Sequence, residues 1–438
     1  MPELFCNTHV AVITPLEPVY LAGFANRNGM SDTIHRALRT KCIVLRNDTT
    51  RVCLVFNDLM EVAKKYDDHI RSIIADSTGI PVSHIFIMSS HSHSTPIMDE
   101  MHLNSSDAND RYRERTISII AKNAIETIKD DKNFVSCRLQ IASGTCMMNT
   151  NRRSIDPKTG EAVIGKSEEG LCDHEVQALR FINAEENVIA TIFNYACHPV
   201  TLGAASKAVS PDYVGMAEET IAKKSGGQAF FMHGAAGDVN PINGLGTSLA
   251  ATDSEGVKLA TAVLSSTFTN DTTKVVLKTA SATILLPYRD QNIDSSFINE
   301  QVKIKSAQKT DFINWKESVY NWGERMKARL NKESKLPNGR SVSIGAVKLG
   351  STMIFFIQGE LFNSYQLKLK KEFPQLHILF AGYTNGEAGY VPDGSAFKAK
   401  GYEVDQAYIF LGEPSPLTSD TESIIVKNME ELVRSISE

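Results

Sequence analysis

The feature that most constrains the fold is a set of short, strongly apolar segments, each of which stops at a polar side chain able to bind a metal. Four such segments end near His91, His198, Asp238 and Glu360. Runs of this length and composition are typical of buried strands. In open α/β sheets, ligands bind beyond the carboxyl ends of the strands, so side chains at those ends converge. The sequence therefore predicts one site built from distant segments.

Periodic patterns between these segments indicate the fold class. Strand-like runs at 41–47 and 51–58 flank a short polar turn, as do runs at 179–183 and 188–196, and each pair predicts a hairpin. Segments with helical periodicity lie at 111–129, 212–224, 254–267 and 421–436. We expect an α/β fold of layered mixed β-sheets with helices packed outside, forming a single domain over residues 1–438.

A charge-rich segment at about 297–335 interrupts this pattern. It carries both tryptophans, Trp315 and Trp322, and predicts a long amphipathic helical excursion between strands. One interpretation is a helix packed on the surface. The other is a lid whose aromatic face covers an acyl chain.

Composition excludes several classes of function. The formal net charge is -5 over 438 residues and Lys and Arg form no dense run, so we expect no nucleic-acid partner. The sequence has no apolar run of about 18 residues and no signal-peptide pattern, which predicts a cytoplasmic protein without a transmembrane segment. The seven cysteines lack CxxC spacing and several lie in apolar runs, which predicts buried reduced thiols.

The strongest donor groups lie at three of the strand ends. His91 and His93 follow the strand at 85–88 and, two residues apart in an extended chain, would face the same side. His198 directly follows another apolar strand. The carboxylate of Glu360 is costly to bury unless a metal or a salt bridge compensates it. Two imidazoles and a carboxylate suit zinc, with one position left open for water.

Two further strand ends carry polar side chains that we expect to line the same site. One strand enters a glycine-rich turn that holds Asp238 and Asn240. A tight turn alone would explain the glycines, although they also let backbone amides approach a ligand closely. Another strand leads to Asn385 and Tyr390.

In their order along the chain, these segments resemble the neutral/alkaline non-lysosomal ceramidases. SSHSHSTP is similar to the family's HTHSGP segment, and NYACHP to the strand that ends in its second zinc histidine. GAAGDVNP resembles GDVSPN, and QGEL resembles the family's GE-plus-helix element. AGYTNGEAGYVPDGSAFKAKGYE is similar to its NxYxxY element and the YEG-like segment that follows. The resemblance runs through most of the chain.

The resemblance implies a metal quartet. His91, His198, Glu360 and Tyr390 would bind one catalytic zinc. His93 would lie beside the site as a polarising or proton-shuttling partner. Which of His91 and His93 contacts the metal stays open.

The roles that the resemblance implies for the neighbouring residues agree with the chemistry of amide cleavage. The reaction needs an activated water, a stabiliser for the tetrahedral oxyanion and a proton for the departing nitrogen. Zinc would activate the water and, together with Tyr402, would stabilise the oxyanion. Glu360 or His93 would relay the proton. The resemblance also implies that Arg152 helps to anchor the substrate.

Three departures from the family pattern shift the expected substrate away from ceramide. Asn240 stands where the family has serine, so an amide replaces a hydroxyl. The segment 95–98 replaces the family's glycines after the first histidines. Family members are secreted or membrane-facing and carry a C-terminal β-sandwich domain, which we do not expect here. We expect a zinc-dependent hydrolase of linear amides that acts on a small-molecule N-acyl substrate, and a homo-oligomer is compatible with the sequence.

Three other functions stay open at this stage. A phosphoesterase-type hydrolase would use a two-metal site with Asp58, Asp212 and Asp238 as extra ligands. The same zinc site, supplied with an acceptor amine, would form an amide as an acyltransferase. A homologue that kept the fold without catalysis would only bind its ligand, an interpretation raised by Asn240.

Overall fold

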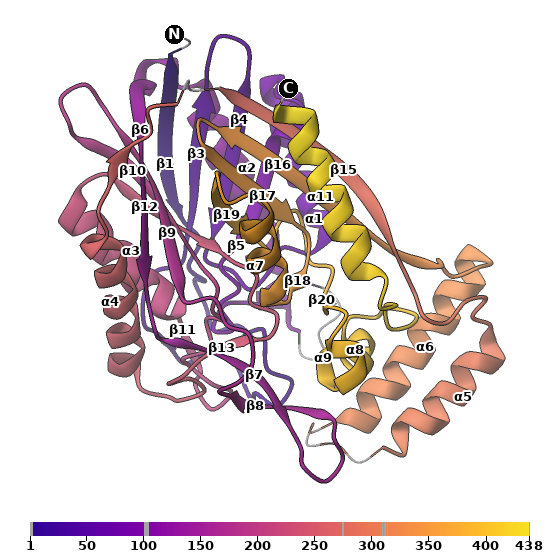
Figure 1. The fold of residues 1–438 in the computed structure, drawn as a ribbon. Helices are drawn as coiled ribbons and strands as arrows, with labels where there is room; N and C mark the ends of the chain where they lie inside the picture. The colour runs from indigo at the N-terminus through magenta and orange to yellow at the C-terminus, as the bar shows by residue number, and fades with distance from the viewer. Residues whose placement is uncertain are drawn as a thin grey trace.

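Two β-sheets packed face to face form the centre of the molecule, with helices on both outer faces (Figure 1). The computed structural model describes residues 3–99, 105–273, 276–308, 310, 312 and 314–437. The four layers are helix, sheet, sheet and helix. This arrangement confirms the predicted α/β class with layered sheets and outer helices.

The larger sheet has nine strands in the order β12-β10-β9-β6-β1-β3-β4-β5, with β14 beside β6. Its strands are β1 (Leu4–Val12), β3 (Arg39–Arg46), β4 (Arg51–Asn57), β5 (Ile85–Ser89), β6 (Val135–Thr145), β9 (Glu175–Ile182), β10 (Val188–Tyr195), β12 (Gln228–His233) and β14 (Thr269–Asn270). The antiparallel pairs β3–β4 and β9–β10 confirm both predicted hairpins. The pairs β4–β5 and β10–β12 are parallel, so the sheet is mixed.

The second sheet has four strands and buries apolar side chains on both faces. In order they are β15 (Leu277–Pro287), β16 (Gly339–Leu349), β17 (Thr352–Ile357) and β19 (His377–Ala381). Successive side chains of a strand point to opposite faces. Ile354 and Phe356 therefore pack against the larger sheet, whereas Phe355 and Ile357 pack with α7 (Asn363–Glu372) and α11 (Thr421–Ser437).

Two helix pairs cover the outer face of the larger sheet. The first pair, α1 (Lys64–Thr78) and α2 (Asp107–Lys129), packs on β3, β4 and β5. The second pair, α3 (Asp212–Ser225) and α4 (Leu249–Ser265), packs on β9, β10 and β12. The helices α2, α3, α4 and α11 confirm the four segments predicted from helical periodicity, and α1 was not predicted.

Short elements gather beyond the lower ends of the two sheets in Figure 1. They include β7 (Asn149–Ile155), β8 (Ala162–Ser167), β11 (Ala208–Val209), β13 (Val239–Pro241), β18 (Glu360–Leu361), β20 (Tyr390–Val391), α8 (Ala396–Ala399) and α9 (Tyr402–Asp405). Also short are β2 (Thr33–Ile34), which pairs with β11, the helix α10 (Ala407–Phe410) and the 3-10 turns Val82–His84 and Asp131–Asn133. The candidate site lies among these elements.

The segment at 297–335 contains two helices rather than one long excursion. They are α5 (Ser295–Ser306) and α6 (Trp315–Glu333), and residues 309, 311 and 313 lie outside the described part. Trp315 and Trp322 are buried, and their indole N–H groups donate to the carbonyls of Lys305 at 2.8 Å and Glu413 at 2.7 Å. Both rings pack against α10. The aromatic face is therefore occupied by protein, as the packed-helix interpretation requires.

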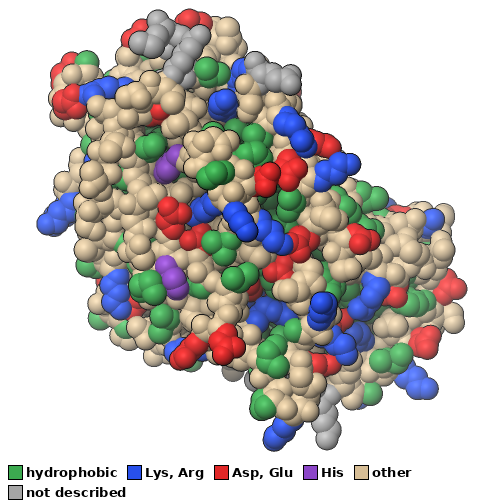
Figure 2. All heavy atoms as spheres, viewed as in Figure 1, with side chains coloured by type: hydrophobic (Ala, Val, Ile, Leu, Met, Phe, Trp, Pro, Cys, Tyr) green, Lys and Arg blue, Asp and Glu red, His purple; other side chains and the backbone are tan. Residues whose placement is uncertain are grey.

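The surface carries mixed charge. Figure 2 shows acidic and basic side chains interspersed over the face in view. Across the part of the chain that the structure describes, none of the helices combines the length and apolarity that crossing a membrane requires.

All seven cysteines have free thiols. Five of them are buried and Cys137 and Cys172 are partly buried. The predicted burial of the cysteines is confirmed for these five.

Candidate metal centre

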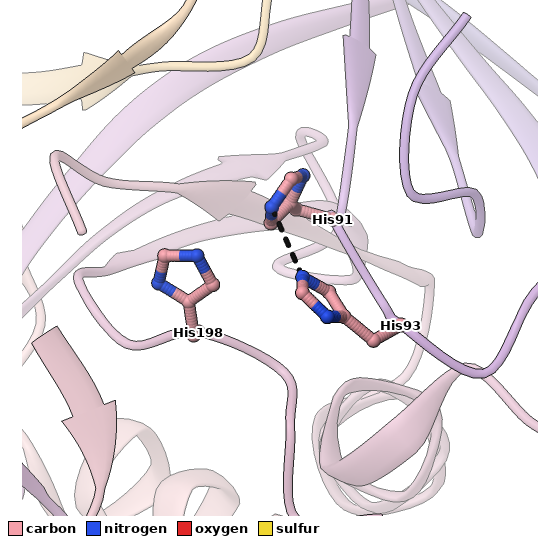
Figure 3. Close-up of side chains that lie close together, drawn as sticks. All are labelled: His91, His93 and His198. Atoms are coloured by element: carbon pink, nitrogen blue, oxygen red, sulfur yellow. Dashed lines mark hydrogen bonds between the residues drawn. The ribbon is translucent and has the colours of Figure 1, made fainter. Parts of the chain in front are cut away.

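Three histidines converge where strands of the larger sheet end. His91 and His93 lie in the loop after β5, and His198 follows β10. One ring nitrogen of each histidine lies within 4.8 Å of the other two, and the Nε2 atoms of His91 and His93 are 3.3 Å apart. Figure 3 shows the three rings directed toward a common centre. The strand ends therefore bring together a group that could hold a metal ion.

Glu360 adds a carboxylate to this group. Its Oε2 atom lies 3.0 Å from His198 Nε2 and 3.3 Å from His91 Nε2. The residue belongs to the short strand β18, and α7 begins three positions later at Asn363. A Cβ atom on Gly237 would lie 2.4 Å from the carbonyl oxygen of Glu360, so the glycine-rich turn is needed for close packing here.

Hydrogen bonds to the backbone fix the orientation of two imidazoles. His91 Nδ1 lies 2.9 Å from the carbonyl of Met60, and His198 Nδ1 lies 2.6 Å from that of Ala236. A carbonyl can only accept, so each Nδ1 carries the proton and each Nε2 presents its lone pair. These lone pairs meet the Glu360 carboxylate within 3.3 Å. The two lone pairs and the carboxylate repel one another unless a cation or a proton lies between them. A metal ion bound at this point would remove the repulsion.

The pKa values of Glu360 and the three histidines shift in different directions. Burial alone would raise the pKa of Glu360, but His91 and His198 hold that pKa well below its usual range. Burial lowers the pKa of His198 to about 4, with Arg152 contributing. Burial and the neighbouring His91 and His198 bring the pKa of His93 well below its usual value. Against the effect of burial, Glu360 raises the pKa of His91. A carboxylate and neutral imidazoles are the forms that bind zinc.

The loop after β5 is not the extended chain that the HxH spacing predicted. His91 has φ of 65°, in the left-handed region, and its N–H donates to the carbonyl of Leu59 at 2.9 Å. His93 N–H donates to the carbonyl of Pro199 at 3.4 Å. The two rings therefore meet because backbone contacts turn the loop, and not because alternate residues of a strand share a face.

Tyr390, Arg152 and Tyr402 form a neighbouring group beside Glu360. Tyr390 pairs with Glu360 in the two-stranded β18–β20 ladder. The Arg152 guanidinium carbon lies 5.3 Å from the ring centroid of Tyr390, and the Tyr402 ring lies 5.5 Å from it. Burial holds the pKa of Tyr390 well above its usual value. Metal binding by Tyr390 and oxyanion binding by Tyr402 stay predictions.

A buried ion pair positions Arg152. Its Nε donates to Glu403 at 3.0 Å, and Arg153 bonds to the other oxygen of the same carboxylate. The side-chain oxygen of Asn240 lies 3.5 Å from Arg152 Nη1. Glu403 was not predicted from the sequence, where its only signal is its position directly after Tyr402.

Asp238 and Asn385 border the site with their polar atoms engaged elsewhere. Asp238 accepts from the backbone N–H of Asn363 at 2.7 Å and from the side-chain amide of Asn151 at 2.9 Å. Asn385 exchanges two hydrogen bonds with the backbone of Ile87, at 2.7 and 3.0 Å. Asn385 thereby joins its loop to β5, the strand that leads to His91.

Two aromatic residues complete the wall, and neither was assigned a role from sequence. The Tyr383 hydroxyl lies 3.5 Å from Glu360 Oε2, and its ring centroid lies 4.2 Å from that of His91. His233, the last residue of β12, donates from Nδ1 to the carbonyl of Ser90 at 2.7 Å and packs against Tyr383. His233 obeys the same strand-end rule as His198, so that rule could have found it.

Known proteins share this fold. The structure is similar to neutral ceramidase from Pseudomonas aeruginosa, with a TM-score of 0.69 and 16% sequence identity over 99% of this chain and 75% of that one. It is equally similar to a ceramidase complexed with C2, with a TM-score of 0.69 and 15% identity over 99% and 76% of the two chains. No curated protein is matched by sequence.

A family model accounts for the first part of the chain. Residues 10–255, more than half of the sequence, match the description neutral/alkaline non-lysosomal ceramidase, N-terminal. The matched region contains His91, His93 and His198, and the remaining strands of the site follow it. The chain belongs to the neutral/alkaline non-lysosomal ceramidase family.

Proposed function

We propose that the protein is a zinc-dependent amidase that hydrolyses the amide bond of a small N-acyl substrate. The observation that carries this proposal is the meeting of two oriented Nε2 lone pairs with the Glu360 carboxylate, at 3.0 and 3.3 Å. Membership of the ceramidase family implies amide hydrolysis. The zinc would be held by His91, His198 and Glu360, with Tyr390 as a fourth ligand.

The residues of the chain would then act on the bound amide. Zinc in this site supplies an activated water and polarises the amide carbonyl. His93, whose Nε2 lies 3.3 Å from that of His91, would relay a proton between the attacking water and the departing nitrogen. Tyr402 would donate to the oxyanion, and the buried guanidinium of Arg152 would hold the acyl amide in place.

Substrate choice should differ from that of ceramide hydrolysis. Asn240 is oriented toward Arg152, so an amide takes part in the wall where the sequence pattern of the family has a hydroxyl. A small N-acylated amine, amino acid or peptide-like metabolite fits the proposal. The acyltransferase direction uses the same groups, and the relative rates of hydrolysis and synthesis would distinguish the two.

The two-metal alternative receives no support from the aspartates on which it depends. Asp212 accepts from the backbone N–H groups of Thr201, Leu202 and Tyr213. Asp58 accepts from the Arg39 N–H at 2.8 Å. These carboxylates are occupied by protein donors away from the histidine cluster.

Turnover and metal content test the proposal together. The purified full chain, with and without added zinc, is assayed for free acid released from a panel of N-acyl amides, and zinc is counted per chain. We expect about one zinc per chain and zinc-dependent release. Glu360→Gln should lose both metal and activity, whereas Glu161→Gln, at an exposed ion pair with Lys400, should lose neither. A protein that binds the amides without cleaving any would contradict the proposal, and an unaffected Glu360→Gln variant would contradict the ligand assignment.

A further inference from the structure

Five arginines are buried in the described part of the chain, and one of them differs from the rest. Four have a carboxylate partner within 4.0 Å: Arg71, Arg113, Arg152 and Arg340. Among the described residues, Arg27 has no such partner. Its side chain is only 5% exposed. A buried charge without a counter-ion is unfavourable, so this position favours a bound anion.

The hydrogen bonds of Arg27 leave one edge of the guanidinium free. Nη1 donates to the carbonyls of Ala22 and His93, both at 2.7 Å. Nε and Nη2 are buried and have no hydrogen-bond partner among the described residues. The carbonyls orient the group without neutralising it. Burial lowers the pKa of Arg27 to about 10, which still leaves it cationic at neutral pH.

The free edge is the one that binds carboxylates elsewhere in this protein. Arg36 uses Nε and Nη2 to hold the two oxygens of Asp253, at 3.1 and 2.9 Å. Arg111 holds Glu17 by the same two atoms, at 3.0 and 2.9 Å. Two parallel N–H donors match the spacing of carboxylate oxygens. The vacant donors of Arg27 thus have the geometry for a carboxylate.

Arg27 also lies in the wall of the candidate metal centre. The Phe24 ring lies 4.9 Å from the His93 ring, and the Arg27 guanidinium lies 5.1 Å from the Phe24 centroid. Gly23 packs so closely that a Cβ there would lie 2.3 Å from the ring of His93. Asn26, the residue before Arg27, is exposed, so the loop that carries Arg27 reaches the surface.

We propose that Arg27 binds the carboxylate of an anionic substrate, and that the amide cleaved at the histidine cluster belongs to an N-acyl amino acid. This inference rests on the proposed amidase function and narrows its substrate class. The carboxylate of an N-acyl amino acid is two bonds from the amide nitrogen. An anchor beside His93 would therefore hold the amide next to His91 and His198.

A matched pair of compounds tests the proposal. N-acylglycine and N-acylglycinamide with the same acyl chain differ only in the replacement of the carboxylate by a neutral amide. Wild-type protein should show a higher kcat/KM for the acid, by about 10- to 100-fold, as expected for charge-assisted hydrogen bonds. In Arg27→Gln the ratio of kcat/KM for the acid to that for the amide should fall close to one, mainly because KM for the acid rises. Arg27→Lys, which keeps the charge without the fork, should retain part of the preference.

The preference is a ratio, so partial unfolding of a variant cannot produce the effect. A purely structural arginine would lower both rates equally and leave the ratio unchanged, which would overturn the proposal. Equal kcat/KM values for the two compounds in the wild type would overturn it as well. Arg138→Gln, at an exposed ion pair on β6, serves as the control and should keep the ratio.

Binding separates failure of this inference from failure of the amidase function. If the wild type cleaves neither compound, calorimetry of the zinc-loaded protein with N-acylglycine and N-acylglycinamide decides the question. Tighter binding of the acid that is lost in Arg27→Gln supports the anchor. Equal affinity for the two compounds overturns it.

Discussion

The histidine cluster and the buried aspartates are both polar groups in the interior, but they are satisfied in opposite ways. Asp212 accepts from three backbone amides and a threonine hydroxyl, so its charge is compensated by protein donors. At the cluster, the donors of His91 and His198 point to carbonyls while their acceptor atoms face Glu360. A carboxylate surrounded by N–H groups is structural. Acceptors that face acceptors form a site for a cation.

The largest effect should come from removing a cluster ligand. His198→Ala should lower kcat/KM by more than about 100-fold, the upper range for losing a mere supporting residue of a metal site. Zinc per chain should fall in parallel, as measured by elemental analysis. The metal-free variant should unfold more easily than the metal-free wild type, because the buried ring and its hydrogen bond to the Ala236 carbonyl are lost. A variant that keeps its zinc would contradict this assignment.

Substitution of Asp212 should lower the stability of the protein and leave its zinc content and activity unchanged. In Asp212→Asn an amide N–H₂ group replaces an oxygen that accepts N–H donors, so the free energy of unfolding should fall by about 1–3 kcal/mol. Denaturation in urea measures this loss. Zinc content and kcat/KM of the folded protein should stay at wild-type values. Loss of zinc in Asp212→Asn would revive the two-metal alternative.

The ionisation of Asp238 should make the stability of the protein depend on pH. Burial raises the pKa of Asp238 to about 7. A raised carboxyl pKa means that the folded state holds the proton more tightly than the unfolded state. Its contribution to stability is therefore fully present below about pH 4 and is lost as the pH rises toward 7.

The comparison of wild type with Asp238→Asn isolates this group, because asparagine cannot ionise. The unfolding free energy of the wild type relative to the variant should fall by up to about 1.4 kcal/mol per pH unit between pH 5 and 7. Urea titrations of metal-free protein at several pH values measure it. A difference that does not change with pH would show that Asp238 stays ionised.

The smallest effect should come from Asn240. Its oxygen lies 3.5 Å from Arg152 Nη1, at the limit of a hydrogen bond, while Glu403 holds the same guanidinium at 3.0 Å. Asn240→Ala should therefore change kcat/KM by less than about tenfold. Steady-state kinetics on the best N-acyl amide would show it. A loss as large as that of His198→Ala would place Asn240 in direct contact with the reacting atoms.

Much of the architecture follows from local sequence patterns. Hairpins, helices and the strands that lead to His91 and His198 are fixed by apolar runs whose length and periodicity are visible in the sequence. The convergence of their ends follows from the rule for α/β sheets. The order of strands and the packing of one sheet on the other depend on contacts between distant segments, which no local pattern encodes.

The parts of the site that local sequence patterns did not predict depend on contacts between distant segments. The turn at His91 is held by the carbonyls of Leu59 and Met60, so the HxH spacing predicted the partners but not the backbone that brings them together. Glu403 lies far in sequence from Arg152 and Arg153, and Arg27 lies far from His93. The family resemblance supplied Tyr390, Tyr402 and Arg152, and the structure places these three in one group beside Glu360.

Anomalous diffraction at the zinc edge would show whether the histidine cluster holds zinc. Crystals of the purified full chain should give one strong peak within about 2.0–2.2 Å of His91 Nε2, His198 Nε2 and a Glu360 oxygen. Crystals of His198→Ala should lose that peak, whereas those of Asp212→Asn should keep it. A zinc peak at another set of residues, or none at the cluster in zinc-replete crystals, would contradict the account.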